Sequence, residues 1–434
     1  MLVFVINNQG EPLMPCKQSK ARKLLKENKA KIKSHEPFTI QLLFGSSGYV
    51  QETNIGIDLG AKYIGVAIQS QNTVIAKGTI ELRDDVKGNL DTRKTYRRSR
   101  RNRKTRYRKA RFSNRVSTKK QGWLPPSIKS RIENTFFWID KFCALLPNPN
   151  LIIEVGKFDV QKMIKPEISG VDYQQGQLYG YYYARYYVLE RDKYTCQVCK
   201  KSKDKIFNTH HIIYRSKGGS DRVDNLITVC TDCHTSENHK EGGIFWEWMS
   251  KNKKVPKYKE APFMNILRRK VFKYYPNAKF VYGSWTTPKR KALHLEKEHY
   301  NDALVISGVT ANFKDNVDLF RISRFRKKKR SLHETTARKN RSCPNKESKR
   351  NAKNTPYSNG FFLNDKVRVF GKMGFISGFC SGGCYVKNIE DNYITMPGKS
   401  YKQVGFKNVE FIKHNNNWQF IPTCRGGGLL DKRC

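Results

Sequence analysis

The chain has 434 residues, a formal net charge of +47 at pH 7 and a pI of about 10.0. Hydrophobic residues make up 38% of it, which is enough for several cores and excludes a wholly disordered chain. Such an excess of positive charge predicts a polyanionic partner, nucleic acid above all. A membrane surface is the alternative, and we do not expect one because the sequence contains no long apolar span and no lipidation motif.

The first 50 residues predict a small unit of their own. A strand at 2–6 leads through a turn to EPLMP, and a basic helix follows with Ser19 as its N-cap. The start is too short and too uncharged for a signal peptide. We therefore expect the eleven cysteines as thiols or metal ligands inside a cell, in bacterial cytoplasm or nucleoid or in an organelle stroma.

Residues 51–165 combine a strand-rich stretch with an unusual basic one. Three β-rich runs up to residue 82 predict an antiparallel meander, with one carboxylate, Asp58, in its first strand. The run 94–112 holds Arg or Lys at most positions and no acidic residue, and it favours a helix. Because nearly every face of that helix is basic, it needs phosphates on more than one side. A second helix at about 128–145 precedes an apolar strand that carries Glu154.

The C-terminal part begins with further helix and strand signals. Helical patterns occur at 263–275 and 299–313, and the second of them begins with His299 and Asp302 three apart on one face. Residues 326–358 read as a basic linker, and short strands with Gly and Asn turns after it predict a small β-barrel at 359–434.

Two cysteine pairs form the most specific pattern in the chain. Cys196 and Cys199 are two residues apart, as are Cys230 and Cys233, which is the spacing of a tetrahedral structural Zn²⁺ site. Four thiolates leave no open position on the ion, so this zinc is expected to be scaffold. Four buried cysteines that pair by chance are the alternative.

Histidines between and beside these cysteines add a second chemistry. His210-His211, Asn225 and His234 resemble the HNH (ββα-metal) nuclease motif. The resemblance implies that His211 is the general base, that His210 and His234 hold Mg²⁺ (or Mn²⁺), and that Asn225 orients the catalytic loop. A neutral imidazole suits a base, and a metal ion neutralises charge on a phosphate. A zinc ribbon used only for binding is the alternative.

Three separated carboxylates suggest a second site. An acid in an apolar strand is costly unless it coordinates something, and carboxylates from two strands and a helix could hold two Mg²⁺ ions. The segments GIDLG, IIEVGKF and HYNDAL resemble the three pieces of the RuvC nuclease, which has a ribonuclease H-like fold. That resemblance makes Asp58, Glu154 and Asp302 metal ligands and His299 the activator of water.

The order of these motifs is similar to that of the IscB family of transposon-associated, RNA-guided nucleases, relatives of the large two-nuclease CRISPR effectors. The fold class is then a multidomain α/β chain. We expect an N-terminal PLMP domain (1–50), RuvC pieces (51–90, 121–165, 260–325), an Arg-rich bridge helix (91–120), an HNH domain (175–255), the linker and the C-terminal barrel. The resemblance implies RNA contacts from the bridge helix: Arg93, Arg97, Arg98, Arg100, Arg101, Arg103, Lys104, Arg106, Arg108, Arg111 and Arg115.

The implied function is RNA-guided cleavage of double-stranded DNA by a monomeric ribonucleoprotein. HNH would cut the strand paired with the guide RNA, and RuvC the displaced strand. The C-terminal domain would contact the RNA and a short motif beside the target. Two alternatives remain: a protein-guided homing or structure-specific nuclease, and a catalytically silent RNA-binding transposon regulator.

Overall fold

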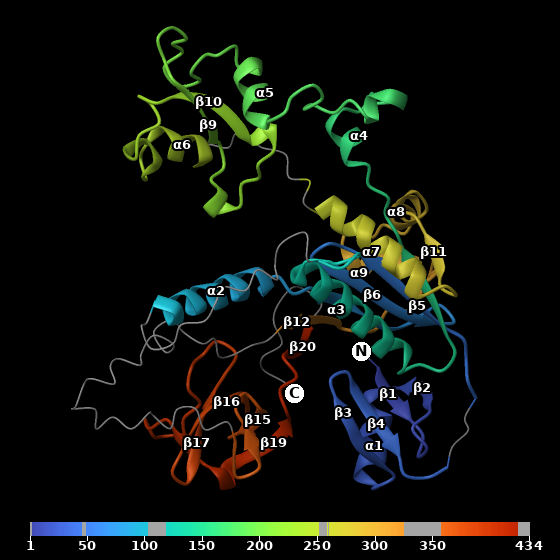
Figure 1. Cartoon of the computed structure of the whole chain (residues 1–434). Coiled ribbons are helices and arrows are strands. Elements are labelled where there is room, and N and C mark those ends of the chain that lie inside the picture. The colour runs from blue at the N-terminus through green and yellow to red at the C-terminus, as the bar shows by residue number, and fades with distance from the viewer. Residues whose placement is uncertain are drawn as a thin grey trace, which may run out of the picture. The chain divides into compact units, whose positions relative to one another are not determined.

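A computed structural model of the chain describes residues 2–45, 49–102, 119–250, 258, 260–324 and 357–423 (Figure 1). It divides into two compact units, one formed by Met1–Gly156 with Leu267–Cys434 and the other by Lys157–Ile266. Both units mix helices with strands, so the multidomain α/β class expected from the sequence is confirmed. Among these described residues, no helix is both long enough and apolar enough to span a membrane.

The N-terminal residues form a four-stranded sheet in the order β2-β1-β4-β3, in which β1 and β4 are parallel. Its elements are β1 (Val3–Ile6), β2 (Pro12–Cys16), α1 (Gln18–Lys26), β3 (Ala30–His35) and β4 (Phe38–Leu42). Helix α1 packs through Ala21 on a core that includes Val3 and Ile40. The expected N-cap was wrong. Lys17 caps the helix without a side-chain hydrogen bond, and Ser19 lies within the first turn.

The largest sheet has seven strands in the order β11-β8-β5-β6-β7-β12-β20. Strands β5, β6 and β7 form the predicted antiparallel meander, and β8 and β11 extend it in parallel. The strands are β5 (Thr53–Leu59), β6 (Tyr63–Ser70), β7 (Thr73–Glu81), β8 (Pro149–Glu154), β11 (Lys279–Val281), β12 (Leu319–Arg324) and β20 (Trp418–Thr423). Besides α1, the described helices of this unit are α2 (Val86–Asn102), α3 (Pro126–Cys143), α7 (Glu260–Tyr274, which begins in the other unit), α8 (Gly283–Ala292) and α9 (His299–Ile306).

Glycines in the sheet let helix α9 approach the strand backbones closely. A Cβ at Gly56 would lie 2.0 Å from the carbonyl oxygen of Ala303, and one at Gly65 would lie 1.8 Å from that of His299. Both positions must therefore lack a side chain, because backbone atoms cannot move aside as side-chain ends can. The N-terminal turn of α9 therefore lies close over β6 at Gly65, and its C-terminal half lies close over β5 at Gly56. The helix ends at Ile306, earlier than the predicted residue 313.

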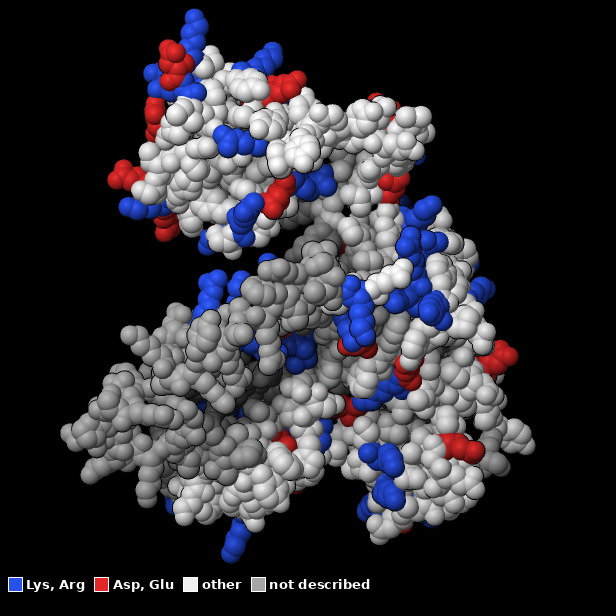
Figure 2. Space-filling model, in the orientation of Figure 1, with Lys and Arg blue, Asp and Glu red and all other residues white. Residues whose placement is uncertain are grey.

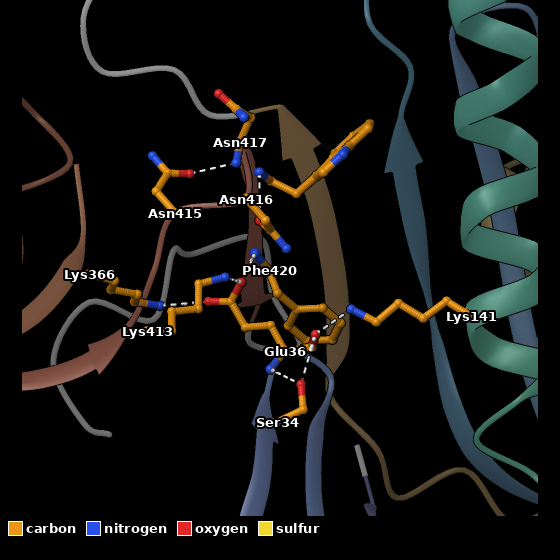
Figure 3. Close-up of polar contacts among 10 residues, drawn as sticks. Ser34, Glu36, Lys141, Lys366, Lys413, Asn415, Asn416, Asn417 and Phe420 are labelled. Carbon is orange, nitrogen blue, oxygen red and sulfur yellow. Dashed lines mark hydrogen bonds and ion pairs between the residues drawn. The ribbon is translucent and has the colours of Figure 1, made fainter. Parts of the chain in front are cut away.

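A buried glutamate, Glu36, joins the N-terminal sheet to four other elements (Figure 3). Its carboxylate accepts hydrogen bonds from Lys366 on β15 (Lys366–Val369) at 2.8 Å, from Lys413 on β19 (Val409–Lys413), and from the Phe420 N–H on β20 at 3.3 Å. The Lys141 ammonium of α3 donates to the Glu36 carbonyl oxygen at 2.7 Å. Burial would raise the pKa of Glu36, but attraction to Lys366 and Lys413 outweighs it and leaves the pKa below its ordinary value.

The C-terminal strands form an antiparallel sheet of five, in the order β18-β17-β16-β15-β19. Its strands are β15 (Lys366–Val369), β16 (Lys372–Cys380), β17 (Gly383–Lys387), β18 (Gln403–Gly405) and β19 (Val409–Lys413), beside a small hairpin of β13 (Tyr357–Ser358) and β14 (Phe361–Phe362). No pairing between β18 and β19 closes a barrel among the described strands. Strand β20, expected in this barrel, pairs instead with β12 in the seven-stranded sheet. Buried Cys384 packs in the core of the five-stranded sheet.

The second unit is built around an antiparallel strand pair. Strands β9 (Phe207–His211) and β10 (Leu226–Cys230) pair, with His211 opposite Leu226. Helix α5 (Ala184–Arg191) covers the pair through Val188, which packs on Val223 and Leu226. The remaining helices are α4 (Val160–Ile164) and α6 (Ile244–Ser250), with short 3₁₀ turns between them.

Candidate active sites

The first site lies on the seven-stranded sheet, at the ends of β5 and β8. Asp58 and Glu154 are directly paired in register on these parallel strands, so their side chains project from the same face. Helix α9 brings His299 to Asp58, whose Oδ2 accepts a short hydrogen bond from His299 Nδ1. The structure therefore brings together residues that lie 241 positions apart in the sequence.

The electrostatics of this site are those of an acidic cluster that His299 and Arg290 compensate only in part. Burial raises the pKa of Glu154, and the charges of Asp58 and Asp302 raise it further against a hydrogen bond from Thr286. Burial and the charge of Asp58 also raise the pKa of Asp302. The Glu154 Oε2 atom is buried and has no hydrogen-bond partner among the described residues. Like charges held together in this way favour a bound cation, which would remove the repulsion.

The carboxylates of this site offer hard oxygen donors. Among the described residues, the oxygens of Asp58, Glu154 and Asp302 do not all lie within 4.8 Å of one another. Hard carboxylate oxygens are the donors that Mg²⁺ prefers. The donor set and its charge therefore fit Mg²⁺.

Sequence reasoning missed Arg290, which belongs to this site. The Arg290 Nε atom pairs with Asp302 Oδ1 at 2.8 Å, and the guanidinium also donates to the Leu295 carbonyl oxygen at 2.9 Å. The side chain is 10% exposed. A buried guanidinium beside a proposed ligand fixes the orientation of that carboxylate. In the sequence, Arg290 lies between two lysines at the end of a basic helix, and nothing there indicates that it contacts a carboxylate.

The second unit holds the four cysteines in one cluster. The sulfurs of Cys196, Cys199, Cys230 and Cys233 all lie within 4.8 Å of one another. The Cys199 and Cys230 sulfurs are 3.8 Å apart. Four sulfurs at about 2.3 Å from a tetrahedral Zn²⁺ would be about 3.8 Å from each other. The geometry thus fits the structural zinc expected from the spacing.

Beside the cysteines lies a cluster of three histidines. His210 and His234 approach each other at 3.3 Å between Nδ1 and Nε2, and His239 completes a group whose ring nitrogens all lie within 4.8 Å. Sequence reasoning missed His239, although its place five residues after His234 was a signal. The buried His210 Nε2 has no hydrogen-bond partner among the described residues. Burial, with the charges of the neighbouring histidines, lowers the pKa of His210 to about 3, which keeps the imidazole neutral and able to bind a metal.

The other two motif residues lie at the edge of this cluster. His211 Nε2 is 2.8 Å from Asp221 Oδ1, a partner that the sequence did not predict. Asn225 is fully buried and bonds the loop that follows β9, because it accepts from the Ile213 N–H and donates to the carbonyl oxygens of Ile213 and Ser220. An amide that ties both ends of a loop in this way fixes the position of the adjoining His211.

The basic helix is present over the part that the structure describes. Helix α2 ends the described stretch at Asn102, and its Arg93, Arg97 and Arg98 are exposed. Arg100 and Arg101 lie in the helix, and the expected contacts Arg103, Lys104, Arg106, Arg108, Arg111 and Arg115 lie outside the described residues. Lys and Arg side chains (blue) are spread over both units on the face shown in Figure 2.

Comparisons with known proteins agree with these features. Residues 3–176 match the family described as RRXRR protein, and residues 97–101 read RRSRR. Residues 196–240 match the HNH endonuclease family. A protein named Anaredoxin from Nostoc sp. (strain PCC 7120 / SAG 25.82 / UTEX 2576) is 39% identical over 54 residues, which are 12% of this chain and 70% of that protein.

One solved structure is also similar to this chain, with low sequence identity and a low TM-score. It is the crystal structure of Streptococcus thermophilus Cas9 in complex with AGGA PAM, with 10% sequence identity and a TM-score of 0.31. The likeness covers 46% of this chain and 28% of that one, so this chain spans about a quarter of the length of that Cas9.

The four cysteines, the histidine cluster and the HNH match define a nuclease with an HNH endonuclease domain. An RRXRR region precedes that domain in the same chain. An RRXRR region followed by an HNH domain in one chain supports the resemblance to the IscB-like nucleases that the motif order indicated.

Proposed function

We propose that this protein is an RNA-guided DNA endonuclease with two active sites, one for each strand of the target. The observation that carries the proposal is that each unit holds a separate catalytic set. The carboxylates lie with His299 in the first unit, and the three histidines lie with His211 in the second. The RuvC-like set would cut the displaced strand, and the HNH set would cut the strand paired with the guide.

In the carboxylate site, Asp58, Glu154 and Asp302 would hold Mg²⁺, which when bound neutralises charge on the scissile phosphate. The hydrogen bond from His299 Nδ1 to Asp58 raises the pKa of His299. The imidazole is therefore a stronger base than usual, and its Nε2 is left to take a proton from water. Arg290 holds Asp302 in place through its ion pair.

In the HNH site, Asp221 accepts a hydrogen bond from the Nε2–H of His211, and in that tautomer His211 Nδ1 carries no proton. That nitrogen can take a proton from an attacking water, and Asn225 holds the loop that positions it. His210, His234 and His239 offer three imidazole nitrogens and no carboxylate. Imidazole suits transition metals, whereas Mg²⁺ prefers oxygen, so the histidine cluster does not fit Mg²⁺ well and we propose Mn²⁺ or a related ion there.

The remaining parts of the proposal concern the partners. The exposed arginines of α2 would contact the guide RNA, and the C-terminal sheet would contact RNA and a motif beside the target. The +47 charge suits a monomeric protein that carries a large RNA. We place its action in the bacterial cytoplasm or nucleoid, or in an organelle stroma, as a transposon-associated nuclease.

One experiment separates this proposal from its two alternatives. The RNA that copurifies with the full-length protein is sequenced, and the complex is then given duplex DNA that matches that RNA, with Mg²⁺ and Mn²⁺. We expect one defined RNA and a double-strand cut at the match. Cleavage without a defined RNA would indicate a protein-guided nuclease. A defined RNA without any cleavage would indicate a silent RNA-binding regulator.

A further inference from the structure

Two tyrosines lie half-exposed beside the HNH site, outside the core that helix α5 covers. Helix α5 buries Val188 against Val223 and Leu226, and neither Tyr183, the N-cap residue of the helix, nor Tyr186 is part of that core. Tyr183 is 59% exposed and Tyr186 is 52% exposed, and their ring centroids are 6.0 Å apart. Tyr181, in the same segment, packs edge-on against Tyr187 at 5.3 Å. Tyr182 is 87% exposed and packs edge-on against Tyr183 at 4.7 Å, so what distinguishes Tyr183 and Tyr186 is the cavity that they line.

Both tyrosines line a cavity of about 440 Å³ that also contains the candidate base. The other polar walls are His211, Asp221, Arg185 and Arg215. Its volume lies in the range of about 300–1,000 Å³ that holds small organic ligands, which is the size class of a single nucleotide. The cavity therefore includes the candidate base His211 and is large enough to hold a nucleotide beside it.

The charges of the cavity favour an anion. Arg185 and Arg215 contribute two positive charges, and Asp221 contributes one negative charge that pairs with Arg215 at 2.8 Å. The Arg215 side chain is 70% exposed, so it can reach a phosphate while it keeps that pair. Guanidinium groups bind phosphate oxygens well, and exposed tyrosine rings stack on bases. Aromatic faces and guanidiniums around one cavity are the chemistry that recognises a nucleotide.

We propose that Tyr183 and Tyr186 form a stacking platform for one unstacked base of the DNA strand whose phosphodiester lies at His211. Arg185 and Arg215 contact the phosphates of that nucleotide. The inference rests on the proposed function, because it assumes that the HNH site cuts DNA. Every base has an aromatic face, so a stacking platform tolerates any sequence. An enzyme that takes its sequence from a guide needs such tolerance at the cut.

A consequence is that the strand is opened at the cut. A base can stack on a tyrosine only if one of its faces is free of its neighbour in the helix. The platform would therefore hold the strand with at least one base step broken. This positions the phosphate at His211 through the adjoining base rather than through contacts to the phosphate alone.

The direct test is a photo-crosslink in the intact complex. The full-length protein with its copurified RNA binds a target in which single 5-iododeoxyuridines replace bases near the cut, with Ca²⁺ in place of the catalytic metal. We expect irradiation to join one or two of these positions to Tyr183 or Tyr186, as read by mass spectrometry. Crosslinks confined to other residues would overturn the platform, as would a second protein chain found on this face.

Kinetics give a second, independent readout. In single-turnover assays, Tyr183→Ala or Tyr186→Ala should slow cleavage of the guide-paired strand by roughly 5- to 150-fold and leave the displaced strand unaffected. Phe at either position should keep the rate, because the ring remains. Tyr179→Ala is the matched control, because Tyr179 is 66% exposed in the same unit and does not line the cavity. Unchanged rates in both alanine variants would contradict the proposal.

The abasic substrate separates stacking from folding. Removal of the base beside the cut should slow the wild-type protein as much as Tyr183→Ala does, and should add nothing in that variant. A protein that cuts neither strand would contradict the proposed function instead. In that case a crosslink from 5-iododeoxyuridine in a plain single-stranded oligonucleotide to Tyr183 or Tyr186 would still support the platform, and its absence would overturn it.

Discussion

Two glutamates in the same unit, Glu36 and Glu154, each place a carboxylate oxygen away from water but in opposite surroundings. Glu36 has its carboxylate bonded by Lys366, Lys413 and a backbone N–H, and its pKa is lowered. Glu154 lies beside two further acids, has an unpartnered oxygen, and its pKa is raised. A buried acid that is surrounded by its own counter-charges stabilises the fold. A buried acid among like charges costs stability, and that cost is retained where a cation is to be bound.

The largest effect is expected from Glu36. Glu36→Ala leaves Lys366 and Lys413 buried without a counter-charge, and breaking a buried ion pair costs about 3–5 kcal/mol. Urea unfolding should report this loss, and hydrogen exchange at Phe420, whose N–H bonds Glu36, should report it locally. Glu410→Ala is the control, because Glu410 is 61% exposed in its pair with Arg368 and should cost about 1 kcal/mol or less. Equal losses of unfolding free energy in the two variants would mean that the ion pairs of Glu36 contribute no more stability than an exposed pair.

Glu154 should show its effect in activity. Glu154→Gln removes one charge from the proposed metal site while it keeps the shape of the side chain. Loss of a group that supports a metal ligand lowers metal affinity or activity about 10–100-fold. Loss of a ligand itself should therefore slow cleavage of the displaced strand by at least about 100-fold. The guide-paired strand should be cut as before, which is the internal control. An unchanged rate on the displaced strand would remove Glu154 from the site.

The pH dependence of stability should separate the two residues. The pKa of Glu36 is lower in the fold than its ordinary value of 4.5, so its stabilisation is complete above about pH 4.5 and is lost as the pH falls below it. The pKa of Glu154 is raised, so the cost of its charge is present at neutral pH and is relieved as the pH falls towards 4.5. Unfolding free energies are measured against pH for the wild type, Glu36→Gln and Glu154→Gln. The difference between the wild type and Glu36→Gln should shift against the wild type as the pH falls below 4.5. The difference between the wild type and Glu154→Gln should shift in favour of the wild type as the pH falls towards 4.5.

The smallest effect is a gain of stability. Without divalent ions, Glu154→Gln should unfold at a slightly higher urea concentration than the wild type, because one like charge has gone. Added Mg²⁺ should stabilise the wild type and have less effect on the variant, since an ion that binds only the folded state favours it. If Glu154→Gln lost stability in metal-free buffer, Glu154 would have a structural role like that of Glu36.

Short sequence patterns predicted many of the candidate site residues. An acid within an apolar strand identified Glu154, and paired spacing identified the four cysteines, because each signal spans only a few residues. Arg290 and Asp221 were missed, since only the folded chain shows that they contact Asp302 and His211.

Long-range pairing explains the errors in the fold. Strand β20 has the pattern of its neighbours in the C-terminal sheet, and only its partner β12 places it elsewhere. Glu36 lies in a short turn between two strands and looks like a surface residue. Its partners Lys141, Lys366 and Lys413 are 105, 330 and 377 positions away, which no local pattern can reveal.

The division of labour between two sites is tested most directly by strand-specific cleavage. Asp58→Ala and His211→Ala are each combined with the copurified RNA and a matching duplex whose two strands carry different labels. We predict that Asp58→Ala cuts only the guide-paired strand and that His211→Ala cuts only the displaced strand. If either substitution abolished both cuts while the DNA remained bound, the two sites would not act on separate strands.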